Sequence, residues 1–387
     1  MFCNLIRAAV VLWMLGFFSV NASASVGIWI SPAELAELPT AGSAWDQLKA
    51  RADQPLDAPP NLSQQNYVNT QVLAKALVYA RTGIETYRTE VVDALIAIID
   101  TENRGDPLAV WRNTAAYVIS ADLVNMPPDE DATFKSFLRK LQTEKIDGKS
   151  IIDVHNRRPN NFGTHAGVGR MAIALYVGDA DDLAKAAAVF KGWLGDRSSY
   201  AGFKYGDDLS WQCDPENPVG INPKSCTKER RTIDGVLPDD QRRSGSFTWP
   251  PPKANYVYGA LDGALSQALI LSRVGYDSWN WEDKALLRAF RWLHKQADFP
   301  PNGDNTWQFA LVDYAYGTQF WDGSLTHPGK SMAWTDWTHS KRAGGIVGRS
   351  TSPDTSRRVI SGAATKSSAN SIKRRIDRHL RHRWWKP

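Results

Sequence analysis

Helical periodicity recurs in segment after segment along most of this 387-residue sequence. In residues 64–81 the apolar positions fall on one face of a helix; they are Val68, Val72, Leu73, Ala76, Leu77 and Ala80. Similar patterns, separated by short links, predict further helices at 31–53, 86–101, 107–124, 132–143, 150–157, 161–177, 179–194, 254–274 and 281–296. Alternating runs of β-branched residues are few, so the sequence predicts an all-α fold. Many helices of similar length in antiparallel pairs favour an α/α toroid, an incomplete helical barrel, over a four-helix bundle.

Residues 195–253 interrupt the helical pattern. The segment is rich in Gly, Asp, Asn, Pro, Ser and Arg, and it carries Trp211, Trp249, Cys213 and Cys226. A structureless segment of this length inside a domain is usually functional or disordered, and the aromatic residues and cysteines favour order. In an oxidising compartment the two cysteines should form a disulfide. We therefore expect an ordered loop that forms a lid or a wall of the binding cleft.

The two ends of the chain differ from its body. Residues 1–24 combine Arg7, an apolar run and an Ala-Ser-Ala sequence, which predicts a signal peptide and a secreted or periplasmic protein. Residues 341–387 hold 13 of the 46 Lys and Arg residues but 2 of the 41 Asp and Glu residues, and predict a basic, disordered tail. Residues 25–340, expected to be one functional domain, are therefore net acidic. Nucleic acid is a disfavoured partner, and an anionic ligand must be bound by a few local basic side chains.

The first motif with catalytic potential lies in residues 158–165, which read Arg-Pro-Asn-Asn-Phe-Gly-Thr-His. Asn160 and Asn161 stand at a predicted helix start, where Asn is a favoured cap. His165 follows Asn161 by four residues, so both share one helix face. A capping Asn and an amphipathic His would also explain this motif without any catalysis, and the motif alone leaves both interpretations open.

The second motif begins with Asp-Asp-Gln-Arg-Arg at 239–243 and continues to a helix start. Arg242 and Arg243 offer guanidinium groups that match the geometry of a carboxylate. Tyr256 and Tyr258 stand at the helix start, and a tyrosine there could transfer protons. The alternative is an ion-paired loop followed by an aromatic helix start.

Together, the asparagine pair and the arginine-rich loop leading into Asn255-Tyr256 resemble the alginate lyase family, over roughly residues 60–330. The family's fold is the α/α toroid of the chondroitin AC lyases. The resemblance implies cleavage of a uronic-acid polymer by β-elimination, with alginate as the first candidate and glucuronan as the second. It also implies that Asn161 binds the substrate carboxylate, that Arg243 stabilises the carboxylate or assists Tyr256, and that Tyr256 is the proton-transfer residue.

This sequence departs from the family at one position. The family has a histidine directly after the asparagine pair, whereas this chain has Phe162 there. His165 is the nearest histidine and is the candidate for the same pocket. The candidates for substrate binding are Asn160, Arg242, Trp211, Trp249, Tyr258 and Lys253. No set of metal ligands stands out, so neither metal nor cofactor is expected. We expect a monomer whose partner is an acidic polysaccharide.

Two other functions compete with the lyase hypothesis. An α/α-barrel glycoside hydrolase needs two carboxylates across the scissile bond, and the pairs at 207–208 and 239–240 offer them. A non-catalytic glycan-binding protein, anchored through the basic tail, would bind acidic polymer without turnover. Product chemistry separates these hypotheses, because only a lyase makes an unsaturated uronide.

Overall fold

The computed structural model describes residues 27–340; the predicted signal peptide at 1–24 and the predicted tail at 341–387 lie outside the described residues. The α-helices are α1 (Pro32–Glu37), α2 (Ser43–Asp53), α3 (Val68–Thr82), α4 (Glu85–Ala97), α5 (Pro107–Val124), α6 (Pro128–Thr143), α7 (Ile151–Arg157), α8 (Asn161–Val177), α9 (Ala180–Leu194), α10 (Pro238–Gln241), α11 (Tyr256–Arg273), α12 (Trp281–Lys295), α13 (Trp307–Tyr316) and α14 (Thr335–Thr338). The strands within this part are β1 (Thr227–Lys228) and β2 (Arg231–Thr232), which form one hairpin. The prediction of an all-α fold is confirmed.

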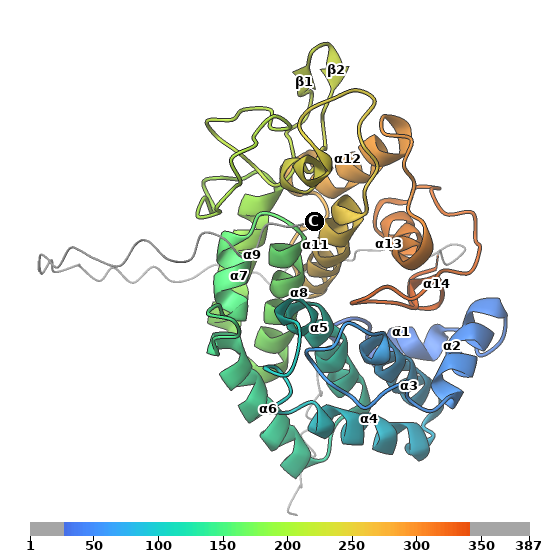
Figure 1. The fold of residues 1–387 in the computed structure, drawn as a ribbon. Coiled ribbons are helices and arrows are strands. Elements are labelled where there is room, and N and C mark those ends of the chain that lie inside the picture. Colours follow the sequence, from blue (N-terminus) through green and yellow to red (C-terminus); the bar gives the residue numbers. More distant parts are fainter. Residues whose placement is uncertain (1–26, 341–387) are drawn as a thin grey trace, which may run out of the picture. The chain divides into compact units, whose positions relative to one another are not determined.

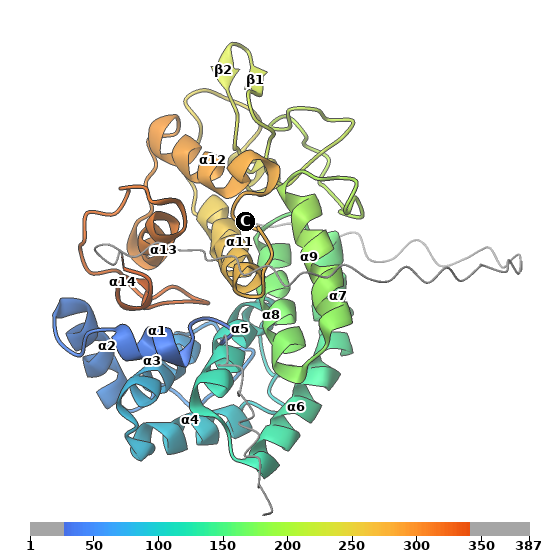
Figure 2. The same cartoon turned by 180° about the vertical axis from the view of Figure 1, so that it is seen from behind.

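The helices form an inner and an outer set. Helices α3, α5, α8 and α11 are buried around most of their circumference, as a helix with apolar residues on all sides must be. They pack on one another in the order α3, α5, α8, α11. Helices such as α4, α6, α9 and α12 lie further out, and the chain follows an arc from α1 to α14 (Figures 1 and 2). This succession of inner and outer helices is the layout expected from the sequence.

Helices α8 and α11 run in the same direction and lie unusually close together. A Cβ atom added at Gly259 would lie 3.5 Å from the Asn161 side chain, and one at Gly263 would lie 2.3 Å from the Thr164 backbone. Further along, the Gln267 amide donates to the Thr164 carbonyl at 3.0 Å. The residue numbers of the contacting positions increase together along both helices, so the N-termini of α8 and α11 lie at the same end of the fold.

Local sequence signals account for several helix boundaries. Asp106 caps α5 through the Leu108 N–H at 2.8 Å, and Asn160 caps α8 through the Phe162 N–H at 3.2 Å. Helix α8 ends at Gly178, which adopts a left-handed conformation. One boundary differs from the prediction: the helix expected at 132–143 begins earlier, at Pro128, because proline fits the first turn of a helix.

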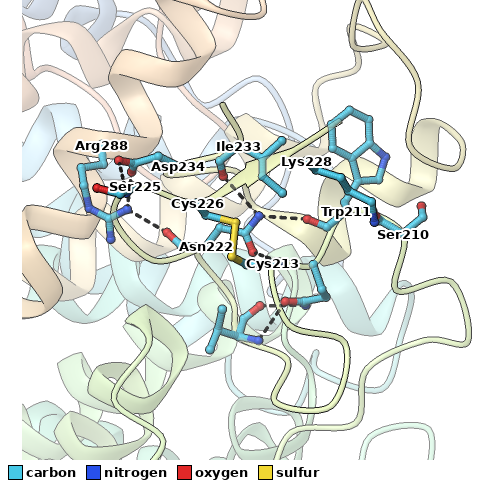
Figure 3. The surroundings of a disulfide bond; sticks show 12 residues. Ser210, Trp211, Cys213, Asn222, Ser225, Cys226, Lys228, Ile233, Asp234 and Arg288 are labelled. Atoms are coloured by element: carbon cyan, nitrogen blue, oxygen red, sulfur yellow. Dashed lines mark hydrogen bonds and ion pairs between the residues drawn. A yellow bond between two sulfur atoms is a disulfide. The ribbon is translucent and has the colours of Figure 1, made fainter. Parts of the chain in front are cut away.

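The long loop at 195–253 is ordered around a disulfide (Figure 3). The sulfur atoms of Cys213 and Cys226 lie 2.07 Å apart, as predicted. Beside them, Asn222 donates from its side-chain amide to the carbonyls of Trp211 and Ile233, at 2.9 Å and 3.2 Å. The loop also contains the β1–β2 hairpin, α10 and a 3-10 turn at Arg242–Ser244, none of which the sequence pattern indicated. The predicted order is confirmed, while the role as a lid or cleft wall stays a prediction.

Candidate active site

Three of the four predicted catalytic residues meet where α8 and α11 begin. Arg243, in the 3-10 turn after α10, donates from Nη1 to the Asn161 side-chain oxygen at 2.8 Å. Its guanidinium carbon lies 3.7 Å from the centre of the Tyr256 ring. Asn161 and Tyr256 are the first residues of α8 and α11. Arg243 therefore connects the start of one inner helix to the start of the next.

The contacts of Arg243 leave donors for a ligand. The side-chain oxygen of Asn161 accepts from Arg243, so the amide NH₂ of Asn161 is the group that remains to donate. Arg243 and Tyr256 are partly exposed, and Arg243 forms no ion pair with a carboxylate of residues 27–340. The centre of the Phe162 ring also lies 5.9 Å from the Arg243 guanidinium carbon. A cation and an amide donor that lie together without a carboxylate partner form a suitable site for an anion.

The asparagine pair is held by a buried pair of carboxylates on α10. Asn160 donates from its amide to Asp239 at 2.8 Å, and the Asn161 backbone N–H donates to Asp240 at 3.1 Å. Asp239 and Asp240 are only 3% and 1% exposed. Burial and the nearby Asp239 charge raise the pKa of Asp240 well above its usual range. The sequence had suggested these carboxylates as hydrolase residues, but their burial keeps them from flanking a glycosidic bond.

His165 lies one turn further along α8, in the interior. Its Nδ1 atom is 3.8 Å from Asp262 of α11 and has no hydrogen-bond partner among the described residues. Burial, with the charges of Arg112 and Lys330, holds the pKa of His165 well below its usual range. Burial raises the pKa of Asp262 to about 7. His165 is therefore a neutral imidazole beside a buried carboxyl group, and its predicted role in catalysis stays a prediction.

The predicted substrate-binding residues are scattered. Arg242 is ion-paired with Asp239 at 2.7 Å, and exposed Lys253 is paired with Asp298 at 3.1 Å. Trp249 is partly exposed, with the Arg231 guanidinium 5.2 Å from its ring centre. Asn160 is the N-cap of α8, and it stabilises the first turn of this helix, where Asn161 lies.

Two of these predictions conflict with the structure. Trp211 is fully buried, and its indole N–H donates to the Gly245 carbonyl at 2.9 Å. Tyr258 is also fully buried, and its hydroxyl donates to the Phe299 carbonyl. Both are core residues, as most large aromatic side chains are. Neither can stack on a sugar ring in this conformation, and of the two tyrosines only Tyr256 reaches the site.

Sequence reasoning missed the supporting roles of Asp240 and Asp262. Both carboxyl groups are buried on helical elements, and the sequence carries no signal of the burial. Arg112 was noticed as a charged residue in an apolar helix; it is 8% exposed, and its Nε atom has no hydrogen-bond partner within the described part of the chain. Its neighbour Asn113 is structural, because its amide donates to the carbonyls of Leu62 and Gln64 at 3.0 Å and 2.9 Å.

Part of the sequence is similar to a known family. Residues 47–199 match the sequence profile described as alginate lyase, and this segment contains the asparagine pair of the site. Over these residues the chain is therefore similar to the alginate lyase family. The family consists of polysaccharide lyases, which is the enzyme class that the sequence resemblance implied. A comparison with curated proteins found no match.

Solved structures agree on the fold. Alginate lyase A1-III from Sphingomonas species A1 superposes with a TM-score of 0.51 at 13% sequence identity, over 82% of this chain and 96% of that chain. A histidine-to-alanine variant of alginate lyase A1-III, complexed with a tetrasaccharide, gives a TM-score of 0.50 at the same 13% identity and the same 82% and 96% coverage. At this identity the likeness concerns the fold, and it confirms the predicted α/α toroid.

Within residues 27–340, no group of three or more His, Cys, Asp or Glu side chains is placed to hold a metal ion. Among the helices of the same residues, none is both long and apolar enough to cross a bilayer.

Proposed function

We propose that this polysaccharide lyase cleaves an acidic uronic-acid polymer by β-elimination at Asn161, Arg243 and Tyr256. The observation that supports this most directly is the position of Arg243, which contacts the Asn161 amide and the Tyr256 ring at once. A uronate presents a carboxylate next to the carbon that loses its proton. The groups that bind this carboxylate must therefore lie next to the group that transfers protons. Asn161, Arg243 and Tyr256 are neighbours of this kind.

Each residue has a defined part in the proposed reaction. The Asn161 amide and the Arg243 guanidinium bind the carboxylate, where negative charge gathers in the transition state. Tyr256, acting as its phenolate, removes the proton from C5, and the electron pair of that bond forms the C4–C5 double bond. The bond from C4 to the glycosidic oxygen then breaks, and the oxygen takes a proton from Tyr256. One tyrosine can serve both steps because it is regenerated in the second.

The substrate we propose is alginate, with glucuronan as the second candidate. We further propose that the enzyme acts outside the cytoplasm, as the predicted signal peptide implies, and that it acts as a monomer. The disulfide supports an oxidising compartment, since structural disulfides persist there.

An ultraviolet absorbance assay tests the proposed function. Purified protein is mixed separately with polymannuronate, polyguluronate, glucuronan and hyaluronan, and the conjugated double bond of an unsaturated uronide is followed. A rise with alginate or glucuronan and not with hyaluronan is the expected result. New reducing ends without absorbance would instead establish the hydrolase alternative. Binding of a polymer without any new ends would establish the glycan-binding alternative.

A further inference from the structure

The buried carboxylates Asp239 and Asp240 take no part in the proposed reaction, yet each contacts one residue of the asparagine pair. Asp239 accepts from the Asn160 amide at 2.8 Å, and Asp240 accepts from the Asn161 backbone N–H at 3.1 Å. The first contact involves the N-cap of α8, and the second involves its first residue. The short helix α10 therefore supports the start of α8 at the residue that we expect to bind the substrate carboxylate.

The two carboxylates differ in how far their oxygens are satisfied. Asp239 also accepts from Arg242 Nε at 2.7 Å and from the Gly206 N–H at 3.4 Å. Asp240 has the Asn161 N–H alone, and its second oxygen has no partner within residues 27–340 although it is completely buried. Asp239 thus has the hydrogen bonds of a structural carboxylate. Asp240 contacts Asn161, but one of its buried oxygens lacks a hydrogen-bond partner within residues 27–340. A buried polar group that lacks a partner is costly, so its retention calls for an explanation.

We propose that Asp240 is a positioning residue, which fixes the Asn161 backbone so that Asn161 and Arg243 meet one substrate carboxylate together. The inference rests on the proposed function, because it assigns that carboxylate to Asn161 and Arg243. Arg243 follows Asp240 by three residues, so the same short segment supplies the cation and holds the amide. A change at Asp240 moves both donors relative to each other.

The protonation state of Asp240 adds a second effect. The charged groups that act on it are Asp239, Arg242 and Arg243, and burial with the Asp239 charge keeps its pKa raised. Two tyrosines lie near this cluster: Tyr205, whose own pKa is raised by burial and by Asp239, and Tyr256 at the start of α11, whose ring contacts Arg243. While Asp240 is protonated, it places no negative charge near Arg243. When it ionises at higher pH, the new charge opposes binding of an anionic sugar.

The test measures binding of tetramannuronate and tetraglucuronate by calorimetry, across a pH series, in a Tyr256→Phe background that prevents turnover. Asp240→Asn keeps an oxygen that can accept the Asn161 N–H, and it removes the ionisable group. Asp240→Leu removes the acceptor as well. The matched control is Asp181→Asn, which changes an exposed carboxylate at the start of α9.

The expected result separates the two variants. Asp240→Leu weakens binding about tenfold, which is the scale of one hydrogen bond. Near neutral pH the Kd of Asp240→Asn lies within about threefold of the parent's Kd. As pH rises, the affinity of the parent declines, whereas the affinity of Asp240→Asn does not change. Asp181→Asn behaves like the parent. If Asp240→Leu does not fold, the pH series of Asp240→Asn decides alone.

Three results would overturn the inference. Both Asp240 variants could match the parent at every pH, Asp240→Asn could lose as much affinity as Asp240→Leu, or the parent itself could bind neither sugar. Binding that depends on Asp240 in a protein that never yields an unsaturated product would leave this inference standing while the proposed lyase activity fails. Cleavage that is indifferent to Asp240 would leave the activity standing and remove the inference.

Discussion

Replacing Arg243 by lysine should reduce catalysis much more than stability. The guanidinium makes two contacts at once: a hydrogen bond of 2.8 Å to Asn161 and a face contact of 3.7 Å with the Tyr256 ring. A lysine keeps the charge, but its point-like ammonium cannot make both contacts in one position. A hydrogen bond to a charged group contributes about 1.5–3 kcal/mol, and a cation over an aromatic ring adds about 0.5–2 kcal/mol.

Together these contacts amount to about 2–5 kcal/mol, or roughly a 30- to 5000-fold loss in kcat/KM if both act in the transition state. The assay is initial-rate formation of unsaturated uronide on the best polymer, with thermal melting measured in parallel. Arg230→Lys is the matched control, because Arg230 is exposed in the turn between β1 and β2. Arg243→Met should be worse than Arg243→Lys, since it also removes the charge. An Arg243→Met protein that keeps kcat/KM within about threefold of the wild type would refute this role for Arg243.

Three further predictions concern the supporting structure. The pKa of Asp262 is raised to about 7, so the folded state holds this proton more tightly than the unfolded state does. Protonated Asp262 therefore contributes about 4 kcal/mol to the free energy of unfolding. This contribution is fully present below about pH 4 and is lost as pH rises through 7. Asp262→Asn should therefore flatten denaturant-measured stability between these pH values, and an unchanged slope would contradict this. Gly263→Ala should cost about 1–3 kcal/mol and reduce activity, because its Cβ would lie 2.3 Å from the Thr164 backbone; a variant with wild-type melting and rate would contradict the close helix contact. Replacing Cys213 and Cys226 by serine should lower the free energy of unfolding by about 2–4 kcal/mol, and calorimetry that finds no change would show that the bond contributes little.

The helical part of the fold was predictable because its signals are local. The bounds expected for α5 and α8 agree with the structure, since Pro107 and Asn160 mark their starts and Asn125 and Gly178 mark their ends. The loop at 195–253 was not predictable in detail. Its short helix, turn and hairpin depend on contacts with distant parts of the chain, such as the bond from Arg288 to Asp234 at 2.6 Å. No periodicity in the sequence records such contacts.

The candidate site divides in the same way. Asn161, Arg243 and Tyr256 were predicted from two motifs and the family resemblance that these motifs carry, and the structure brings all three together. Trp211 was predicted to bind sugar but is a core residue, because composition does not tell an aromatic side chain at a surface from one in a core. Asp240 was noticed only as a possible hydrolase acid, and its contact with the Asn161 N–H became visible only in three dimensions.

Tyr256 is the central element of the proposed reaction, and product analysis tests it most directly. The wild type, Tyr256→Phe and Tyr258→Phe are incubated with the polymer that gives the strongest absorbance, and their products are identified by mass spectrometry. Tyr258→Phe is the matched control, because its hydroxyl is buried against the Phe299 carbonyl. We expect unsaturated oligouronides from the wild type and from Tyr258→Phe, and none above background from Tyr256→Phe. Unsaturated products from Tyr256→Phe at the wild-type rate, or saturated products from the wild type, would contradict the account.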